Sequence, residues 1–465
     1  MAENPLAYEK ISRLLRSFAV PSITATLVSS LYNIVDQIFI GQGVGYLGNA
    51  ATNVSYPLST ICLAISLLLG IGSASRFSIY LGKKEPERAA RLVGNGIVLM
   101  AGAGVLYLAV GELLLMPLLR VFGATTEVMP FAQQYAGIVL IGMPFLILTN
   151  GISNLIRADG SPRYSMLCMV AGAIVNTILD PVFIFLLDWK VFGAALATIL
   201  GQFLSFGLAL RYLWRFRTVR LTRSCFRLEP RDNLRTLYMG ISSCINQVAI
   251  TLVQIVLNNS LTHYGALSAY GKEIPLAACG IVMKTNAILL SIIVGISQGV
   301  QPIIGFNFGA GKYDRVRQAF LLAIKWNFAV SAVGFCLFQF FPGPIISLFG
   351  DGDPLYFEFA ILFMRTFLFM VLVNGVQLLS SNFFTAIGKA LKGLLLSLTR
   401  QVFFLIPLIL LLPLRLGIFG VLLAGPIADF IAFVVSVIFV AREFKTLHAK
   451  EAGQLSWAGS FRVFS

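Results

Sequence analysis

Four side chains in otherwise apolar stretches of the sequence carry oxygen atoms that could bind a proton or a hard cation. They are Asp36, Asn176, Asp180 and Thr198. Carboxylate, amide and hydroxyl oxygens are the ligands that hard cations prefer. Two carboxylates that share one site resist being ionised together, which suits proton exchange. The set therefore predicts a site for Na⁺ or H⁺, and the alternative is a structural hydrogen-bond network.

The composition places these residues in a membrane protein. Of 465 residues, 57% are hydrophobic and only 12% are charged, whereas soluble domains are about 25% charged. A membrane-spanning helix needs about 20 mainly apolar residues. Twelve segments meet this requirement: 18–40, 53–80, 92–115, 130–156, 164–187, 192–210, 237–262, 274–308, 318–341, 356–386, 393–414 and 418–441. The six Cys form no CxxC pair and there are two His, so we expect neither a zinc site nor a disulfide framework.

The basic residues predict the orientation of these segments. With the N-terminus inside, most of the 35 Lys and Arg residues fall in cytoplasmic loops or at the two ends of the chain. The outer loops hold only Arg120, Lys190, Lys272 and Arg415. This asymmetry is typical of the positive-inside pattern. It predicts that both termini are cytoplasmic, and it accounts for the net charge of +15 without nucleic-acid binding.

The two halves of the sequence resemble each other at an offset of about 228 residues. The matched blocks are Gly82-Lys83-Lys84-Glu85 with Gly311-Lys312-Tyr313-Asp314, Asn154, Ala158 and Gly160 with Asn382, Ala386 and Gly388, and Phe192-Gly193 with Phe419-Gly420. An even repeat of six spans keeps its orientation in the membrane, as in many secondary transporters. We therefore predict an all-α integral membrane protein with twelve transmembrane helices in two six-helix bundles, related by a pseudo-twofold axis along the membrane normal. The predicted parts are an N-terminal lobe (1–210), a basic cytoplasmic linker (211–236), a C-terminal lobe (237–441) and a cytoplasmic tail (442–465).

The sequence indicates how transport would be driven, because it lacks a nucleotide-binding motif and has ionisable residues in its spans. The closest approach to a phosphate-binding GxxxxGK[ST] motif, Gly305 to Tyr313, has the wrong spacing and ends in Tyr. Uphill transport would then use an ion gradient, which needs an ionisable site within the membrane. We expect no cofactor other than the coupling ion, and no enzymatic activity.

Distances along the helices bring the four polar residues to a similar depth. Asp36 lies about 27 Å along the first span and Asp180 about 24 Å along the fifth, both from the cytoplasmic side. Thr198 lies about 9 Å from the outer side in the sixth span. Tyr32 and Asn176 are each one helical turn from an aspartate. The matching positions of the second half, around 404 and 408, are apolar, which predicts that the ion site lies in the first half.

Pro181 is expected to support this site, because a proline within a helix frees a backbone carbonyl, here that of Thr177. The deepest charges of the second half are Lys284, Arg365 and Arg400. They are expected either to neutralise carboxylates such as Asp36 or to line the transport path.

The remaining charged residues of the spans have simpler expectations. Arg76, Glu112 and Lys325 lie near span ends, so they are expected to face water or extend toward the interface. Asp429 stands where the first half has Gln202, and it is expected to be paired or to face a cavity.

Several motifs together resemble the multidrug and toxic compound extrusion (MATE) family, most closely its MepA-like and DinF-like bacterial branches. The motifs are Tyr32-Asn33-Ile34-Val35-Asp36, Ile156-Arg157-Ala158-Asp159-Gly160, Asn176-Thr177-Ile178-Leu179-Asp180-Pro181, Gly299-Val300-Gln301-Pro302 and Asn307-Phe308-Gly309-Ala310-Gly311-Lys312. The resemblance spans about residues 10–445 and implies a V-shaped pair of bundles that alternates between inward-open and outward-open states.

The resemblance also implies a function. It implies export of organic, often cationic, compounds in exchange for H⁺ or Na⁺, across the cytoplasmic membrane of a bacterium. We expect a monomer, because nothing in the sequence requires a larger assembly. The resemblance implies a cation site at the residues matching Asp36, Asn176, Asp180 and Thr198. Tyr32, Asn33, Pro181, Lys284 and Gln301 are expected to support the site or line the substrate path.

Other readings remain open at this point. Some branches of the family carry an acidic pair in spans seven and ten, where this chain has only Gln247, Gln254, Asn374 and Gln377. A flippase for a lipid-linked or amphipathic substrate is the main alternative. A passive channel fits the repeat less well, and an integral-membrane enzyme would need a cluster of reactive groups that the sequence does not show.

Overall fold

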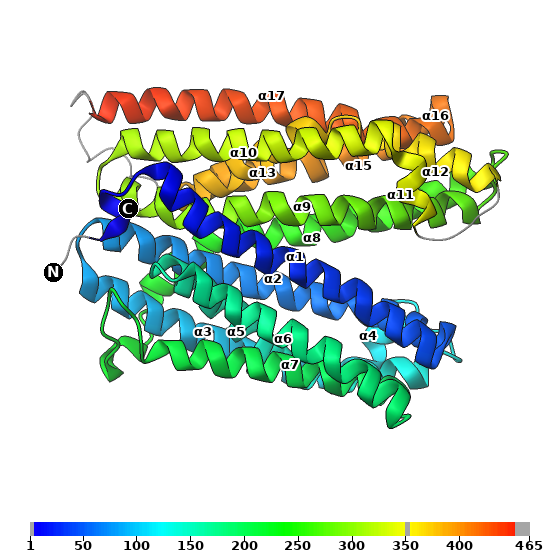
Figure 1. Cartoon of the computed structure of the whole chain (residues 1–465), viewed down its shortest axis with the longest axis horizontal. Helices are drawn as coiled ribbons and strands as arrows, with labels where there is room; N and C mark the ends of the chain where they lie inside the picture. The colour runs from blue at the N-terminus through cyan, green and yellow to red at the C-terminus, as the bar shows by residue number, and fades with distance from the viewer. Residues whose placement is uncertain (1–3, 349–353, 452–465) are drawn as a thin grey trace. The chain divides into compact units, whose positions relative to one another are not determined.

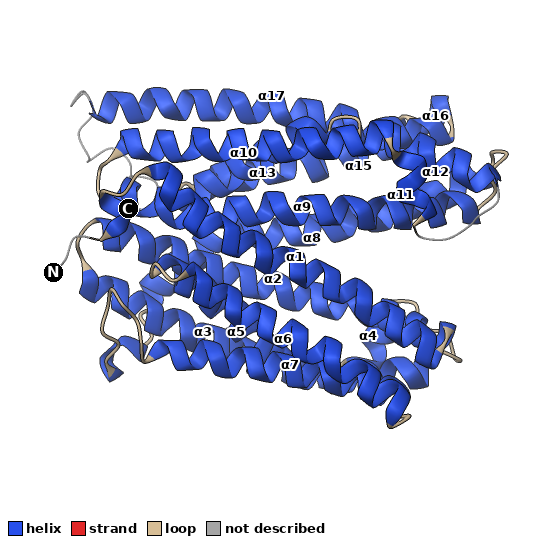
Figure 2. Ribbon diagram, in the orientation of Figure 1, coloured by secondary structure: helices blue, strands red, loops and turns tan. Residues whose placement is uncertain are grey.

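The computed structural model describes residues 4–348 and 354–451, and in this part of the chain all regular structure is helical, without a strand (Figure 2). Eleven helices are long and apolar enough to cross a membrane. A bent pair of helices, joined at an angle of 50°, brings the number of spans to twelve. The predicted fold class, an all-α membrane protein with twelve spans, is confirmed.

Most of the helices drawn in Figure 1 begin before the apolar segments that predicted them, and several end before those segments do. The long helices are α1 (Ile11–Val44), α2 (Tyr46–Gly82), α3 (Pro86–Leu113), α5 (Met129–Ala158), α6 (Pro162–Pro181), α7 (Lys190–Leu213), α8 (Pro230–Ala266), α9 (Glu273–Gly309), α10 (Tyr313–Phe340), α12 (Pro354–Phe367), α13 (Val371–Ala386) and α17 (Ile418–Glu451). Short helices are η1 (Pro5–Ala7), α4 (Leu115–Val121), η3 (Arg223–Phe226), α11 (Pro342–Ser347), α14 (Ala390–Leu398), α15 (Ile406–Leu411) and α16 (Pro413–Leu416). The predicted span 356–386 is the bent pair α12 and α13, because the chain leaves the helical path between the two helices.

The chain divides into two compact units. Unit 1 comprises Met1–Arg16, Ser78–Glu85 and Val253–Ser465, and unit 2 comprises Ser17–Phe77 and Pro86–Leu252. The predicted lobe and linker boundaries stay a prediction. Of the predicted tail, residues 442–451 continue α17, and residues 452–465 lie outside the described part of the chain.

The repeated sequence blocks have repeated backbone conformations. Gly160 follows α5 and Gly388 follows α13, and both have a positive φ, of 85° and 83°. Glycine adopts this left-handed conformation without the steric cost that a Cβ imposes. Each half also has a π-helical turn before its last long helix, η2 (Val182–Leu186) in one and η4 (Thr399–Leu405) in the other. The two blocks therefore encode corresponding helix ends.

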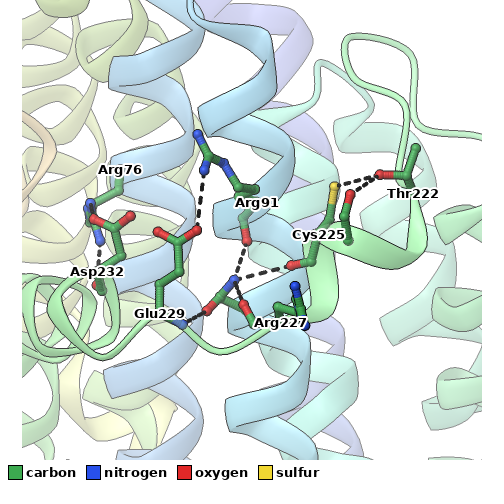
Figure 3. A network of polar contacts seen from close by, with 9 residues as sticks. Arg76, Arg91, Thr222, Cys225, Arg227, Glu229 and Asp232 are labelled. Carbon is green, nitrogen blue, oxygen red and sulfur yellow. Dashed lines mark hydrogen bonds and ion pairs between the residues drawn. The ribbon is translucent and has the colours of Figure 1, made fainter.

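The segment expected to be a basic linker packs firmly on unit 2 (Figure 3). Asn95 on α3 donates from Nδ2 to the carbonyl oxygens of Cys225 (3.1 Å) and Arg227 (2.8 Å), and its Oδ1 accepts from the Glu229 amide (2.9 Å). A Cβ on Gly94 would lie 2.3 Å from the Cys225 oxygen, so this position needs glycine.

Arg76 corrects an expectation from the sequence. Its side chain is 4% exposed, and its Nη2 lies 2.6 Å from Asp232 Oδ1 at the start of α8 (Figure 3). Nη1 donates to Thr236 Oγ1 at 3.1 Å. The guanidinium is buried because α8 supplies a carboxylate and a hydroxyl to it, whereas the sequence alone indicated a water-facing residue.

Candidate cation site

The site lies in unit 2, where α6 and α7 approach closely enough for their polar groups to meet. A Cβ on Gly172 of α6 would lie 2.6 Å from the Gly201 carbonyl oxygen of α7. The two glycines thus allow the backbones to pack without side chains between them. One turn further along, Asn176 Nδ2 donates to Thr198 Oγ1 across the helix pair, at 3.4 Å.

Asp180 extends this contact within α6. Asn176 Nδ2 also lies 3.4 Å from Asp180 Oδ1. Asp180 is completely buried and Asn176 is 3% exposed. The carboxyl group of Asp36, on α1, lies against that of Asp180. The four side chains that the sequence singled out therefore lie together, although their role in binding an ion stays a prediction.

Three oxygen atoms of this group are buried without a hydrogen-bond donor in the described part of the chain. They are Asp36 Oδ1, Asn176 Oδ1 and Asp180 Oδ2. Buried oxygens of this kind are costly unless they are protonated or bound to a cation. The donor set fits Na⁺, which takes oxygen ligands, and it equally fits a proton shared between carboxyls. No cluster of three or more His, Cys, Asp or Glu occurs among the described residues, so a transition-metal site is not indicated there.

The backbone around Pro181 contributes to the geometry of the site. The α-helix ends at Pro181, and the π-helical turn η2 follows it directly. Ile184 of this turn is buried with Ile40 of α1 and Ala194 of α7. This small apolar cluster packs α1, η2 and α7 together beside the polar group, and so holds Asp36 near Asp180.

Tyr135 on α5 belongs to the site and was missed in the sequence. Its phenol group lies close to Thr198, Asp36, Asp180 and Tyr32. The depth argument that placed Thr198 about 9 Å from the outer side also places Tyr135, five residues into the span 130–156, at a similar depth of about 7.5 Å. A search for every polar side chain at this depth would have found it.

The other predicted residues of the first half differ in their positions. Tyr32 lies close to Asp36 and Asp180. Asn33 is exposed and donates from Nδ2 to the Ser29 carbonyl at 2.6 Å, so the structure does not bring it into the group.

A cavity of ≈ 70 Å³ adjoins the polar group within unit 2. Tyr32, Asn176 and Thr198 form part of its wall, and further polar groups come from Ser29, Thr149, Asn150, Gln202 and Ser205. Since a water molecule occupies about 30 Å³ in the liquid, the cavity holds a few waters or a partly hydrated ion. Pockets for organic ligands measure about 300–1,000 Å³, so this cavity is too small for such a ligand in this conformation.

The charged residues expected to compensate Asp36 have other partners or none. Arg400 Nε lies 2.5 Å from Asp429 Oδ1 within unit 1, which confirms that Asp429 is paired. Arg365 Nε donates to the Gln339 carbonyl at 3.0 Å. Lys284 is exposed on α9, and Gln301 is buried on the same helix. Glu112 and Lys325 are exposed, as expected.

Comparisons with known proteins point in one direction. A family model described as MatE matches residues 21–182 and 243–411, one segment in each half. The chain is 25% identical over 423 residues to a FAD transporter of Shewanella oneidensis, covering 90% of this chain and 92% of that one. It is 24% identical over 435 residues to the multidrug export protein MepA of Staphylococcus aureus, covering 92% and 93%. It is 24% identical over 397 residues to the probable multidrug resistance protein YoeA of Bacillus subtilis, covering 82% and 84%.

Solved structures share the fold. A multidrug resistance MATE transporter in an outward-facing conformation superposes with a TM-score of 0.89 at 22% identity, covering 96% of this chain and 99% of that one. A transporter of the MOP superfamily from Pyrococcus furiosus superposes with a TM-score of 0.88 at 22% identity, covering 96% and 98%.

Proposed function

The chain belongs to the MatE family of multi-span membrane transporters, and on this premise we propose that it is a secondary active antiporter. It exports organic compounds across the membrane in exchange for H⁺ or Na⁺, by alternating access. The observation that supports this most directly is the group of partnerless buried oxygens on Asp36, Asn176 and Asp180, which suits a coupling ion.

The ion site works through the charge of the two aspartates. With both carboxylates ionised, the site is unstable without a cation, because burial penalises each charge and the two repel. Binding of a proton or Na⁺ removes this penalty. Loss of the ion restores the penalty. The difference in free energy between the ion-bound and the ion-free site changes the relative stability of the inward-open and outward-open states.

Coupling to the substrate follows from thermodynamic linkage. If the ion drives the substrate out, each must weaken the binding of the other by the same factor. The small cavity beside the site supports a division of roles, in which the aspartate group takes the ion and the organic compound binds where there is more room.

The substrates are organic, amphipathic compounds, and cations are the first class to test because the sequence resembles a family that often exports them. The relatives named as multidrug export proteins and as a FAD transporter support an organic compound as the substrate. The partners are small organic molecules and membrane lipid, with no nucleic acid, and the transporter works as a monomer in the bacterial cytoplasmic membrane.

The test uses purified protein in liposomes. A pH gradient and a Na⁺ gradient, imposed one at a time, should drive movement of a fluorescent organic cation. The Asp36→Asn variant should lose this drive, while Glu112→Gln, which removes an exposed carboxylate from the same unit, should retain it. Normal gradient-driven transport by Asp36→Asn, movement with neither gradient, or lipid scrambling in its place would each contradict the proposal.

The orientation has a separate test. We infer that both termini and the segment around Arg220 face the cytoplasm, on the distribution of Lys and Arg. A cysteine at Arg220 should react with an impermeant maleimide only in inside-out vesicles, and one at Thr126, which is exposed between α4 and α5, only in right-side-out vesicles. The reverse pattern would overturn the orientation.

A further inference from the structure

Lys284 is a charged residue within a span that has no charge partner. It lies 11 residues into the 37-residue helix α9, about 17 Å along its axis. Its side chain is exposed. No hydrogen bond or ion pair joins it to another of the described residues. An ammonium group at this depth is costly in lipid and is usually found facing a water-filled passage.

The face of α9 around Lys284 is built differently from a lipid-facing surface. Its exposed neighbours one or two turns away are Leu276, Ala277, Gly280 and Ala287. A Cβ on Gly280 would meet no atom within 4 Å, so the space beside the lysine is open. Most of these side chains are small, and they leave open space beside the lysine for a ligand.

Helix α10 of the same unit provides the contrast. Its exposed face carries large apolar side chains, which suit contact with lipid: Leu321, Phe328, Val333, Leu337 and Phe340. The two helices therefore present surfaces of different chemistry. Lys325, 12 residues into α10, is exposed among these large apolar side chains, whereas Lys284 is flanked mainly by small ones.

Two buried carboxylates on α17 of unit 1, those of Asp429 and Glu443, already have basic partners. Asp429 pairs with Arg400 at 2.5 Å. Glu443 on α17 pairs with Lys389, and with Lys392 at 2.9 Å. These pairs leave the charge of Lys284 uncompensated among the described residues. A negatively charged group of a ligand would complete the pair.

Polar groups of α8 lie close to this part of α9. Gln254 Nε2 donates to Asn258 Oδ1 at 2.8 Å, and Asn258 Oδ1 also accepts from Cys279 Sγ of α9 at 3.9 Å. Cys279 precedes Lys284 by five residues, about 7.5 Å along the helix. Cys279 is buried and lies about 140° around the helix from Lys284, so these polar groups anchor α8 to the side of α9 opposite the lysine.

We propose that Lys284 recognises a carboxylate or phosphate group on the exported compound, so that amphipathic anions and zwitterions are bound more tightly than neutral or purely cationic analogues. This inference rests on the proposed export function, and it names a substrate class within it. The ammonium group supplies the charge-assisted hydrogen bond, and the apolar body of the compound lies along the small side chains of α9.

The test compares two forms of one dye. Rhodamine B carries a free carboxylate, and its ethyl ester does not. Binding of each is measured by fluorescence anisotropy with the full chain in lipid nanodiscs, without any gradient. In Lys284→Gln the dissociation constant for rhodamine B should rise about tenfold, because a hydrogen bond to a charged group is lost. The constant for the ester should not change, and Lys284→Arg should keep the preference for the acid.

Lys325→Gln is the matched control, since it removes an exposed lysine from α10 of the same unit. It should leave both constants unchanged. An equal affinity of the native and Lys284→Gln proteins for rhodamine B would overturn the inference, as it would show that the lysine extends to the membrane surface. An equal loss for acid and ester would overturn it too. Failure of gradient-driven transport with the acid preference intact would instead contradict the proposed antiport.

Discussion

Asn176 and Asp180, one turn apart on α6, share a hydrogen bond of 3.4 Å from Nδ2 to Oδ1, while Asn176 Oδ1 and Asp180 Oδ2 are buried without a donor. Thr198 Oγ1 accepts a second hydrogen bond from the same amide nitrogen, at 3.4 Å. The amide thus links a carboxylate to a hydroxyl and leaves oxygens free on the other side. This arrangement is costly for a site that stays empty and suitable for one that takes up and releases a cation.

Replacing Asp180 by Asn should separate stability from function. The variant removes one of two adjacent buried carboxyls, so at pH 8 without Na⁺ it should be more stable than the native protein by about 1–2 kcal/mol. Gradient-driven transport should fall at least tenfold, because the ion loses a charged ligand. Thermal unfolding in detergent and a liposome assay measure the two effects. A less stable variant with intact coupling would contradict this account.

Replacing Tyr135 by Phe should weaken the ion site without unfolding it. The phenol group lies near Thr198 and both aspartates, so loss of its hydroxyl should lower the ion affinity by about three- to tenfold. Tyr107→Phe is the matched control, since Tyr107 Oη donates to the Leu58 carbonyl at 2.7 Å, and Tyr107 is not among the residues near the aspartates. It should cost about 1 kcal/mol of stability and leave the affinity unchanged. An unchanged ion affinity in Tyr135→Phe, with a lower affinity in Tyr107→Phe, would show that Tyr135 does not contribute to the site.

Asp159 should prove to be a structural residue. It follows α5 and accepts hydrogen bonds from the Arg217 amide (2.8 Å), the Thr218 amide (3.1 Å) and Tyr212 Oη (2.8 Å). Asp159→Asn places an N–H group against these donors, so the free energy of unfolding should fall by about 1–3 kcal/mol with unchanged ion affinity. Unchanged stability would contradict this role.

The pH dependence of that loss has a definite sign. Burial raises the pKa of Asp159 above its usual value, although its hydrogen bonds act in the opposite direction. A carboxyl whose pKa is higher in the folded state stabilises the fold below its unfolded pKa, and this contribution is lost as the pH rises through the folded pKa. The difference in stability between native and Asp159→Asn proteins should therefore widen as the pH is lowered. A constant difference would show that Asp159 does not titrate differently on folding.

Arg400 and Asp429 should depend on each other. Removing one partner leaves a buried charge, so Arg400→Met should cost about 3–5 kcal/mol. The double variant Arg400→Met/Asp429→Leu should recover most of this loss, because an apolar pair of similar volume replaces the ion pair. Thermal unfolding of the four proteins gives the coupling energy. Additive losses would show that the two side chains do not stabilise each other.

Much of the fold could be predicted from the sequence because hydrophobicity and helix length are local properties. The twelve apolar segments predicted the spans, and Gly160 with Gly388 marked corresponding helix ends. The bend between α12 and α13 was not predicted, since residues 368–370 contain neither Pro nor Gly. The bend depends on tertiary packing, which local sequence patterns do not indicate.

The site could be approached from the sequence only as far as depth along a helix allows. This argument brought Asp36, Asp180 and Thr198 to one level, but it could not say which way Asn33 points. Partners distant in sequence were also beyond it. Arg76 is buried because Asp232, 156 residues later, lies beside it. Tyr135 was overlooked because tyrosine in a span is usually an interfacial or packing residue.

The central claim is that the Asp36–Asp180 group binds an ion that the exported compound displaces. Its most direct test is ion release, measured with purified protein in weakly buffered solution, with a pH indicator and a Na⁺ electrode. Addition of a transported compound at saturating concentration should release H⁺ or Na⁺ from the native protein and none from Asp36→Asn. Binding of the compound to the native protein without any release of H⁺ or Na⁺ would contradict the account.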